Sequence, residues 1–482
     1  MQRVSRKLGE NTEYFKRRFE NCGDVVSRVF AAGTGRKVYV AYIDDLADRE
    51  MLERQVIRGL MVDTRDGDIA PSPQRLLESA LITADVKEQE YLENCVDEIL
   101  AGNAVVIVDG LCTAAVVSAK KVPGRGVNKP DTEISVQGPQ DAFTESLRTN
   151  TVLIRRRIRS SNLKCVQMKL GKKTQTDTAV MYIEGTADEN VVKSVLARLE
   201  KTAAEGILDS GCVEQYLKKG EKTLFPLVQL TERPDKTAAG LIEGRVAVVC
   251  DNSPFVILAP AVLFSFYQAS EDYYQQWQTA SFMRLIRLAA GLAAFTLPGL
   301  YVAVTMYDPS MLPAELSLHL AGARTGVPVS AMTEVTVLEL AFETLREAGV
   351  RMPAAVGGTL GVVGGIIIGQ AAVDAGLVSP MVVIVTAVTG ICAFSIPSQQ
   401  LTVAYRVIKF GVIIASAVLG IYGFILAVIC VFVHLTSLES FGLPYIYPLG
   451  KKSALKDTFL RLPIEKQDGG EPVFAKNKTG GA

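Results

Sequence analysis

Side chains that commonly perform catalysis are scarce in this chain. The two histidines, His319 and His434, both border long apolar stretches, and neither belongs to a Ser-His-Asp or Cys-His set that would activate a nucleophile. The eight cysteines stand singly, without the paired spacing of a zinc site, and we expect most of them to be small buried side chains in a reducing compartment. The sequence therefore predicts no enzyme, no metal and no cofactor.

Two basic motifs are candidates for anion-binding sites. The run GKKT at 171–174 lacks the upstream glycine of a phosphate-binding loop, and its second lysine replaces the hydroxyl residue that would hold magnesium, so we interpret it as a β-turn. The run RRRIR at 155–159 either binds anionic lipid or an acidic partner, or forms the solvated face of a domain. With 51 basic and 51 acidic residues, the net charge is zero and does not favour nucleic acid as a partner.

One uncharged stretch, 352–373, has glycine at every fourth position. These residues are Gly357, Gly361, Gly365 and Gly369. At helical pitch they form one stripe without side chains, since residues four apart lie on the same face. Each interior glycine costs a soluble helix roughly 1 kcal/mol relative to alanine, whereas in a bilayer small residues let two helices approach closely. The stripe therefore predicts a membrane helix that packs tightly against other helices.

The other face of this helix carries larger side chains. They are Thr359, Val363, Ile366 and Gln370, with Val362 on the flank. A ring of such helices would enclose a narrow and mostly hydrophobic pore, where wetting and drying can gate conduction. The alternative is a bundle helix buried in lipid with an incidental glutamine.

Acidic residues lie on both sides of the glycine helix. Three of them, Glu334, Glu339 and Glu343, fall on an amphipathic helix expected over 327–348, and Asp374 follows the glycine helix. They either attract cations toward a pore or, for the three glutamates, face water from an interfacial helix. Asp374 is either a vestibule charge or a boundary residue.

Charged residues are frequent up to about residue 250 and rare from Leu288 onward, so we expect an α+β membrane protein. Alternating strand and helix patterns predict two α/β domains, 34–135 and 136–253, after an N-terminal segment, 1–33. The first residues lack the apolar core of a signal peptide, so we expect both domains to be cytoplasmic.

The second half is expected to be an α-helical transmembrane domain, 254–449, with a polar tail, 450–482. Stretches near the roughly 20 residues of a membrane span lie at 288–307, 352–373, 380–397 and 410–433. The apolar run at 254–267 is shorter and contains Pro260, so we expect it to be interfacial or re-entrant. Arg284 and Arg287 place the start of the first span inside the cell. Four crossings return the tail to the cytoplasm, and a fifth, through 327–348, would put it outside.

Several segments resemble the A subunit of the GerA-type spore germinant receptors. In the apolar half they are PGLYVAVTMYDPSMLPAELSLHLAGARTGVPV (298–329), LELAFETLREAGVRMPAAVGGTLGVVGGIIIGQAAVDAGLVSP (338–380), IPSQQLTVAYRVIKF (396–410) and HLTSLESFGLPYIYPLG (434–450). In the polar half they include QGPQDAFTESLRTNTVLIRRRI (137–158), EGRVAVVCDNSPFV (243–256) and EDYYQQW (271–277). The resemblance is collinear and covers most of the chain.

The resemblance implies a subunit of a nutrient sensor in the inner membrane of the spore. Family A subunits are expected to assemble as a homo-oligomer, a pentamer, that forms a nutrient-gated cation channel and triggers germination. A transporter-like B subunit would bind the nutrient, and a C subunit is a lipoprotein. Two alternatives stay open: a signalling scaffold that conducts nothing, and a receptor-like paralogue that amplifies germination beside the dipicolinate channel. The sequence does not distinguish nutrients, ring sizes or ion selectivities.

Overall fold

The computed structural model describes residues 1–63, 85–121, 129–202, 204–218, 220–351, 369–448, 457–463, 465 and 474. The chain forms two compact units. Unit 1 comprises 1–221, 228–260 and 469–482, and unit 2 comprises 222–227 and 261–468.

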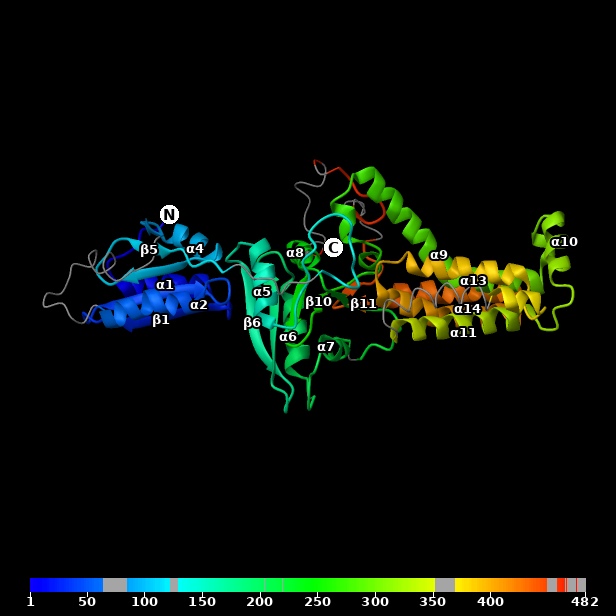
Figure 1. The fold of residues 1–482 in the computed structure, drawn as a ribbon, viewed down its shortest axis with the longest axis horizontal. Helices are drawn as coiled ribbons and strands as arrows, with labels where there is room; N and C mark the ends of the chain where they lie inside the picture. Colours follow the sequence, from blue (N-terminus) through cyan, green and yellow to red (C-terminus); the bar gives the residue numbers. More distant parts are fainter. Residues whose placement is uncertain are drawn as a thin grey trace, which may run out of the picture. The chain divides into compact units, whose positions relative to one another are not determined.

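The first half of unit 1 is an antiparallel sheet with helices on both faces (Figure 1). Its strands are β1 (Val25–Ala31), β2 (Lys37–Ile43), β3 (Val86–Gln89), β4 (Ala104–Val108) and β5 (Ala114–Val117), in the order β1-β2-β4-β5-β3. One face packs against α1 (Leu8–Arg18) and α4 (Leu92–Leu100), and the other against α2 (Arg49–Met51) and the π-helices η1 (Leu52–Ile57) and η2 (Gly59–Asp63).

Strand β2 shows why this sheet is covered on both sides. Its residues Tyr39, Ala41 and Ile43 join the core beneath α1 and α4, while Val38 and Val40 join the core on the opposite face. Successive side chains of a strand point to opposite faces. The nearly continuous apolar run KVYVAYI is therefore buried on both sides rather than alternating between core and solvent.

The second half of unit 1 is another antiparallel sheet. Its strands are β6 (Leu163–Leu170), β7 (Thr176–Ile183), β8 (Gln229–Thr231), β9 (Val246–Cys250) and β10 (Val256–Ala259), in the order β6-β7-β9-β10-β8. Helices α5 (Leu147–Arg157) and α8 (Pro234–Ile242) share a core with it. Helix α7 (Ser210–Leu217) contacts β10 and also α6 (Glu189–Glu200).

A short segment joins the two halves of unit 1. Residue Cys22 forms a β-bridge with Cys165 of β6, which is the edge strand of the second sheet. The amide of Gly23 donates to the Cys165 carbonyl over 2.8 Å. Beside this bridge, the Arg155 guanidinium donates to both oxygens of Asp24, over 2.6 and 2.8 Å, and both side chains are buried. Burial lowers the pKa of Arg155, but the charge of Asp24, its hydrogen bonds with the guanidinium and the nearby Cys22 and Cys165 together raise the pKa above its ordinary value. The Arg155 guanidinium therefore stays charged, and its ion pair with Asp24 links the halves.

Unit 1 corrects three expectations. The N-terminal segment 1–33 is not separate, because it contributes α1 and β1 to the first sheet. The two domains were expected to be α/β but are α+β, since every pair of neighbouring strands described in their sheets is antiparallel. Antiparallel strands such as β6 and β7 can be joined by a hairpin and need no crossover helix. The apolar run at 254–267 is not re-entrant, because its first part is β10, a buried strand between β9 and β8.

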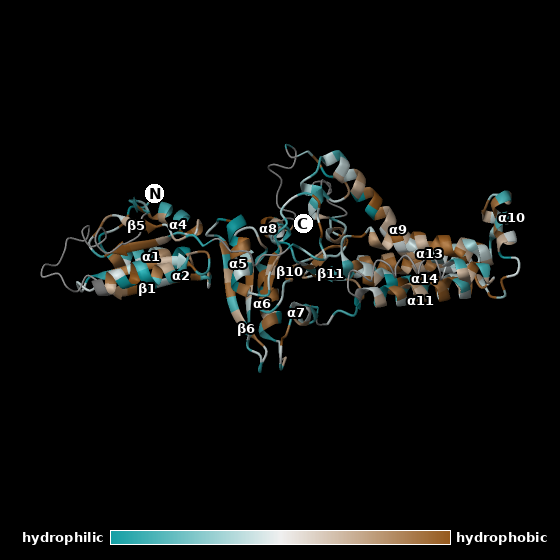
Figure 2. Ribbon diagram, in the orientation of Figure 1, coloured by the Kyte–Doolittle hydropathy of each residue, from teal (hydrophilic) through white to brown (hydrophobic). Residues whose placement is uncertain are grey.

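Unit 2 is a helical bundle with a short two-stranded sheet. Its elements are η3 (Leu263–Phe266), η4 (Ser270–Tyr273), α9 (Trp277–Met306), η5 (Pro309–Met311), α10 (Ala314–Ala323), α11 (Ala331–Arg351), α13 (Pro380–Phe394), α14 (Gln399–Ser437), β11 (Glu439–Ser440) and β12 (Leu443–Pro444). Helices α9, α11, α13 and α14 lie side by side (Figure 1). Figure 2 shows hydrophobic residues spread along α13 and α14.

Helix α14 is a hairpin rather than one straight span. Gly420 has φ 61° and ψ −140°, which breaks the helix into a first arm, 399–419, and a second arm, 421–437. The ring of Phe225 lies 6.2 Å from that of Tyr405 on the first arm and 6.0 Å from that of His434 on the second. The second arm therefore returns beside the start of the first. This corrects the expectation of an unbroken span over 410–433.

Two described helices, α9 and α14, are long and apolar enough to cross a membrane, and α13 is a shorter apolar helix. The length of α14 is divided at Gly420 between its two arms, 399–419 and 421–437. The amphipathic helix expected over 327–348 is present as α11. Most of the glycine helix expected over 352–373 falls outside the described residues.

Candidate functional site

The most distinctive feature of unit 2 is a cluster of charged residues buried between α11 and α14. Glu339 and Glu343 are four residues apart on α11, and Arg406 and Lys409 are three apart on α14, so each pair shares one helix face. The Lys409 ammonium lies 2.5 Å from Glu339 and 3.5 Å from Glu343, and the Arg406 guanidinium lies 3.0 Å from Glu343. Two carboxylates thus neutralise two cations.

Burial makes this cluster energetically important. The side chains of Lys409 and Glu339 are only 5% and 4% exposed. Taking a charge out of water costs several kcal/mol, which attraction within the pair offsets only when both partners are present. An isolated charge at either position would therefore destabilise the fold. Buried charges among apolar helices commonly mark a functional site.

A second buried carboxylate lies near the other end of α11. One oxygen of Glu334 accepts from Arg324 over 3.0 Å, and the other accepts from the backbone amide of Ser379 over 2.8 Å. The glutamate is 1% exposed. It thereby connects the segment after α10 with the residue that precedes α13.

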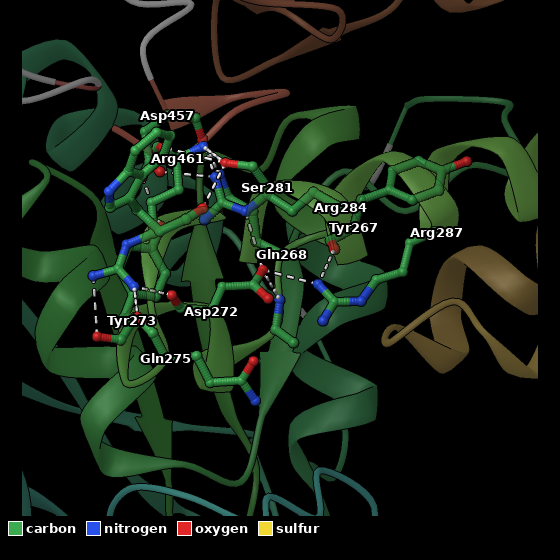
Figure 3. A network of polar contacts seen from close by, with 12 residues as sticks. Tyr267, Gln268, Asp272, Tyr273, Gln275, Ser281, Arg284, Arg287, Asp457 and Arg461 are labelled. Carbon is green, nitrogen blue, oxygen red and sulfur yellow. Dashed lines mark hydrogen bonds and ion pairs between the residues drawn. The ribbon is translucent and has the colours of Figure 1, made fainter. Parts of the chain in front are cut away.

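A third polar network holds the start of α9 (Figure 3). The Asp272 carboxylate accepts from Arg284 over 3.0 Å and from Arg287 over 2.8 Å. Arg284 also donates to Asp457 over 2.7 Å, and the Arg461 guanidinium donates to the backbone carbonyls of Asp272, Tyr273 and Gln275. The segment 457–463 is therefore fastened to the base of the first long helix. Arg284 and Arg287, noted in the sequence for topology, serve here as ion-pair partners.

The site residues expected from the sequence fall into three groups. Most of the glycine stripe and pore-lining set lies outside the described residues: Gly357, Gly361, Gly365, Thr359, Val362, Val363 and Ile366. Of the rest, Gly369 is buried against Val383, and Gln370 is exposed. Among the expected cation-attracting residues, Asp374 is exposed, whereas Glu334, Glu339 and Glu343 have cationic partners within the chain.

Sequence reasoning missed the basic half of the cluster. Arg324, Arg346, Arg406 and Lys409 were not predicted as site residues. A signal was present, because Arg406 and Lys409 are three residues apart at the start of a long apolar helix. The sequence did not show that α11, with its two matching glutamates, would be the neighbour.

The comparison with protein families decides what kind of protein this is. Residues 13–471 match the family described as Bacillus/Clostridium GerA spore germination protein. The chain belongs to the GerA family. The match includes both halves of unit 1 and the described helices of unit 2, so the buried charge cluster lies within the GerA region.

Similar proteins agree with the GerA assignment. Spore germination protein KA of Bacillus subtilis (strain 168) is 40% identical over 464 residues, covering 95% of this chain and 85% of the relative. The B. subtilis uncharacterized membrane protein YfkQ is 36% identical, covering 95% and 90%, and spore germination protein GerLA of Bacillus cereus is 34% identical, covering 94% and 93%. The crystal structure of the N-terminal domain of the A subunit of the Bacillus megaterium spore germinant receptor GerK3 matches with TM-score 0.44 and 31% identity, covering 54% of this chain and 98% of that one.

Proposed function

We propose that this GerA-family chain is the A subunit of a nutrient germinant receptor. In this proposal, copies assemble as a ring, a pentamer, that forms a nutrient-gated cation channel in the inner membrane of the spore. Unit 1 lies in the cytoplasm, and a transporter-like B subunit and a lipoprotein C subunit complete the receptor. Membership of the GerA family is the observation that carries the proposal.

The surface of unit 2 supports its placement in a membrane. Large apolar side chains on α13 and α14 are more than half exposed, among them Ile391, Phe394, Val418, Tyr422 and Ile429. Soluble proteins rarely expose contiguous apolar surface of this kind, so lipid or other helices are expected to cover it. Pairing of Lys409 with Glu339 fits the same environment, because a membrane bundle tolerates charges that are neutralised inside it.

The glycine stripe supports the assembly. Because Gly357, Gly361 and Gly365 present no side chains, the helices of neighbouring copies can approach closely around an axis. The opposite face would then line the conduit, with Val362 and Val363 as its hydrophobic gate. Asp374 remains the acidic residue best suited to attract cations, since it is exposed.

The alternative function is a signalling scaffold that conducts no ions. It is favoured by the pairing of Glu334, Glu339 and Glu343, because these carboxylates are neutralised within one chain and offer no free charge to a passing cation. The receptor-like paralogue beside the dipicolinate channel would share this architecture. Co-purification with a transporter-like B subunit separates the receptor from the paralogue.

Cation flux separates the channel from the scaffold. We expect Val363→Ala to weaken the hydrophobic gate, so that the variant, purified and reconstituted into liposomes, releases trapped potassium without nutrient, while the wild type stays closed. Gly322→Ala provides a control, because an added Cβ at Gly322 on α10 meets nothing within 4 Å. Liposomes that retain potassium with both Val362→Ala and Val363→Ala would speak against the gate and favour the scaffold.

A further inference from the structure

A cavity of about 570 Å³ lies among α11, α13 and the first arm of α14. Its lining is mostly apolar and includes Phe342, Leu345 and Ala393. Two further lining residues, Ile391 and Phe394, are 67% and 75% exposed, so the cavity opens at the surface of the bundle. A cavity of this size accommodates a small molecule or part of a lipid.

The charged residues that line this cavity do not balance. Three cations, Arg346, Arg406 and Lys409, face two carboxylates, Glu339 and Glu343, which leaves one positive charge in excess. Arg406 and Lys409 are the two that are paired. Arg346 stacks on Phe394, 4.6 Å from the ring centroid, and no carboxylate of the described residues forms a salt bridge with it. The unbalanced charge therefore lies at Arg346, beside the exposed rim.

Two residues that line the cavity each have a buried polar atom with unused hydrogen-bonding capacity. Glu339 uses Oε2 for Lys409, while its buried Oε1 has no hydrogen-bond partner within the described protein. The Nε atom of Arg406 is also buried without a hydrogen-bond partner among the residues that the structure describes. A buried polar atom left unpaired costs about 1–3 kcal/mol. An occupant that donates a hydrogen bond to the Glu339 carboxylate would remove the cost at Oε1.

We propose that this cavity binds an anionic phospholipid whose headgroup carries hydroxyl donors, such as phosphatidylglycerol. Its phosphate would pair with Arg346 and balance the excess charge, and a headgroup hydroxyl would donate to Glu339 Oε1. Its acyl chains would continue over the exposed apolar rim formed by Ile391 and Phe394. Basic pockets between membrane helices commonly bind anionic headgroups. The inference rests on the membrane placement in the proposed function, but not on conduction.

Native mass spectrometry of the full-length protein tests this site. The detergent-solubilised chain is mixed with equal amounts of phosphatidylglycerol and phosphatidylcholine with identical acyl chains. We expect one phosphatidylglycerol molecule to be retained preferentially, and Arg346→Gln to reduce that retention by roughly tenfold, since a charge-assisted hydrogen bond is lost. Arg346→Lys should restore part of the preference. Arg351→Gln is the control, because Arg351 lies on the same helix in an exposed pair with Glu347.

Three outcomes would overturn the lipid site. The first is equal retention of the two lipids by the wild type, and the second is unchanged retention of phosphatidylglycerol by a folded Arg346→Gln variant. The third is displacement of phosphatidylglycerol by glycerol phosphate, which would indicate a site for a soluble phosphate ester. Retention is measured without ion flux. A chain that binds phosphatidylglycerol but conducts no cations would therefore refute the channel and support this site.

Discussion

Replacing Lys409 with methionine is expected to destabilise unit 2 by about 3–5 kcal/mol. The substitution leaves the Glu339 carboxylate buried without its ion-pair partner, which is far more costly than removing both charges. Glu343 is less affected, because it keeps Arg406 at 3.0 Å. Thermal unfolding of the detergent-solubilised protein, followed by circular dichroism, should show a fall in Tm on the order of 10 °C.

Two further variants separate this mechanism from a general loss of packing. The double variant Lys409→Met with Glu339→Leu removes both charges, so it should recover most of the lost stability. Arg351→Met breaks the exposed pair with Glu347, whose side chains are 79% and 67% exposed, and should cost less than about 1 kcal/mol. Equal Tm values for Lys409→Met and Arg351→Met would show that the buried pair is not important for stability.

Substituting valine for Gly420 is expected to open the α14 hairpin. Gly420 has a positive φ that a β-branched residue rarely adopts, and an added Cβ would lie 2.9 Å from Cγ of Tyr307. Tyr307 also donates its hydroxyl to the Ala417 carbonyl over 2.6 Å, which satisfies an acceptor exposed by the break. Without the break, the 39 residues of α14 would form a helix roughly 58 Å long, about twice the thickness of a bilayer core.

The hairpin can be measured by the distance between its arms. Spin labels are placed at Val403 and Val433, which are exposed on the first and second arms. The two labels should lie within roughly 20 Å of each other in the wild type. In Gly420→Val their separation should increase toward roughly 45 Å, which is the length of a continuous helix between the two positions. Gly411→Val is the matched control, because an added Cβ there meets nothing within 4 Å. Unchanged label distances in Gly420→Val would contradict the hairpin's dependence on glycine.

Much of unit 1 could be predicted from local patterns. The β-rich runs at 37–43 and 104–108 form the buried strands β2 and β4, and the run at 163–169 forms most of β6. The order of strands and their antiparallel pairing depend on contacts between distant segments, which one sequence does not show. The expectation of an interfacial or re-entrant segment at 254–267 was wrong for a related reason. A strand that is buried on both faces has the same apolar composition as a short membrane segment.

Unit 2 was less predictable, for reasons that can be named. The stretch 410–433 is uniformly apolar, so hydropathy alone does not reveal that Gly420 breaks it. The available sequence signal was a second glycine close by, Gly423. In the structure an added Cβ at Gly423 would overlap the Ala415 carbonyl of the other arm. The glutamates of α11 were recognised as candidates, but their partners on α14 lie more than sixty residues away. The ion pairs depend on tertiary packing.

The most direct test of the proposed channel is imaging of the detergent-extracted, full-length assembly. The account predicts a closed ring of identical chains, five in number, in which the stripe of Gly357, Gly361 and Gly365 packs against neighbouring copies and the opposite helix face lines the axis. Gly361→Leu should prevent this ring from forming, because its side chain would occupy the space where two backbones meet. A single protomer whose glycine stripe faces lipid, or an intact ring in Gly361→Leu, would contradict the account.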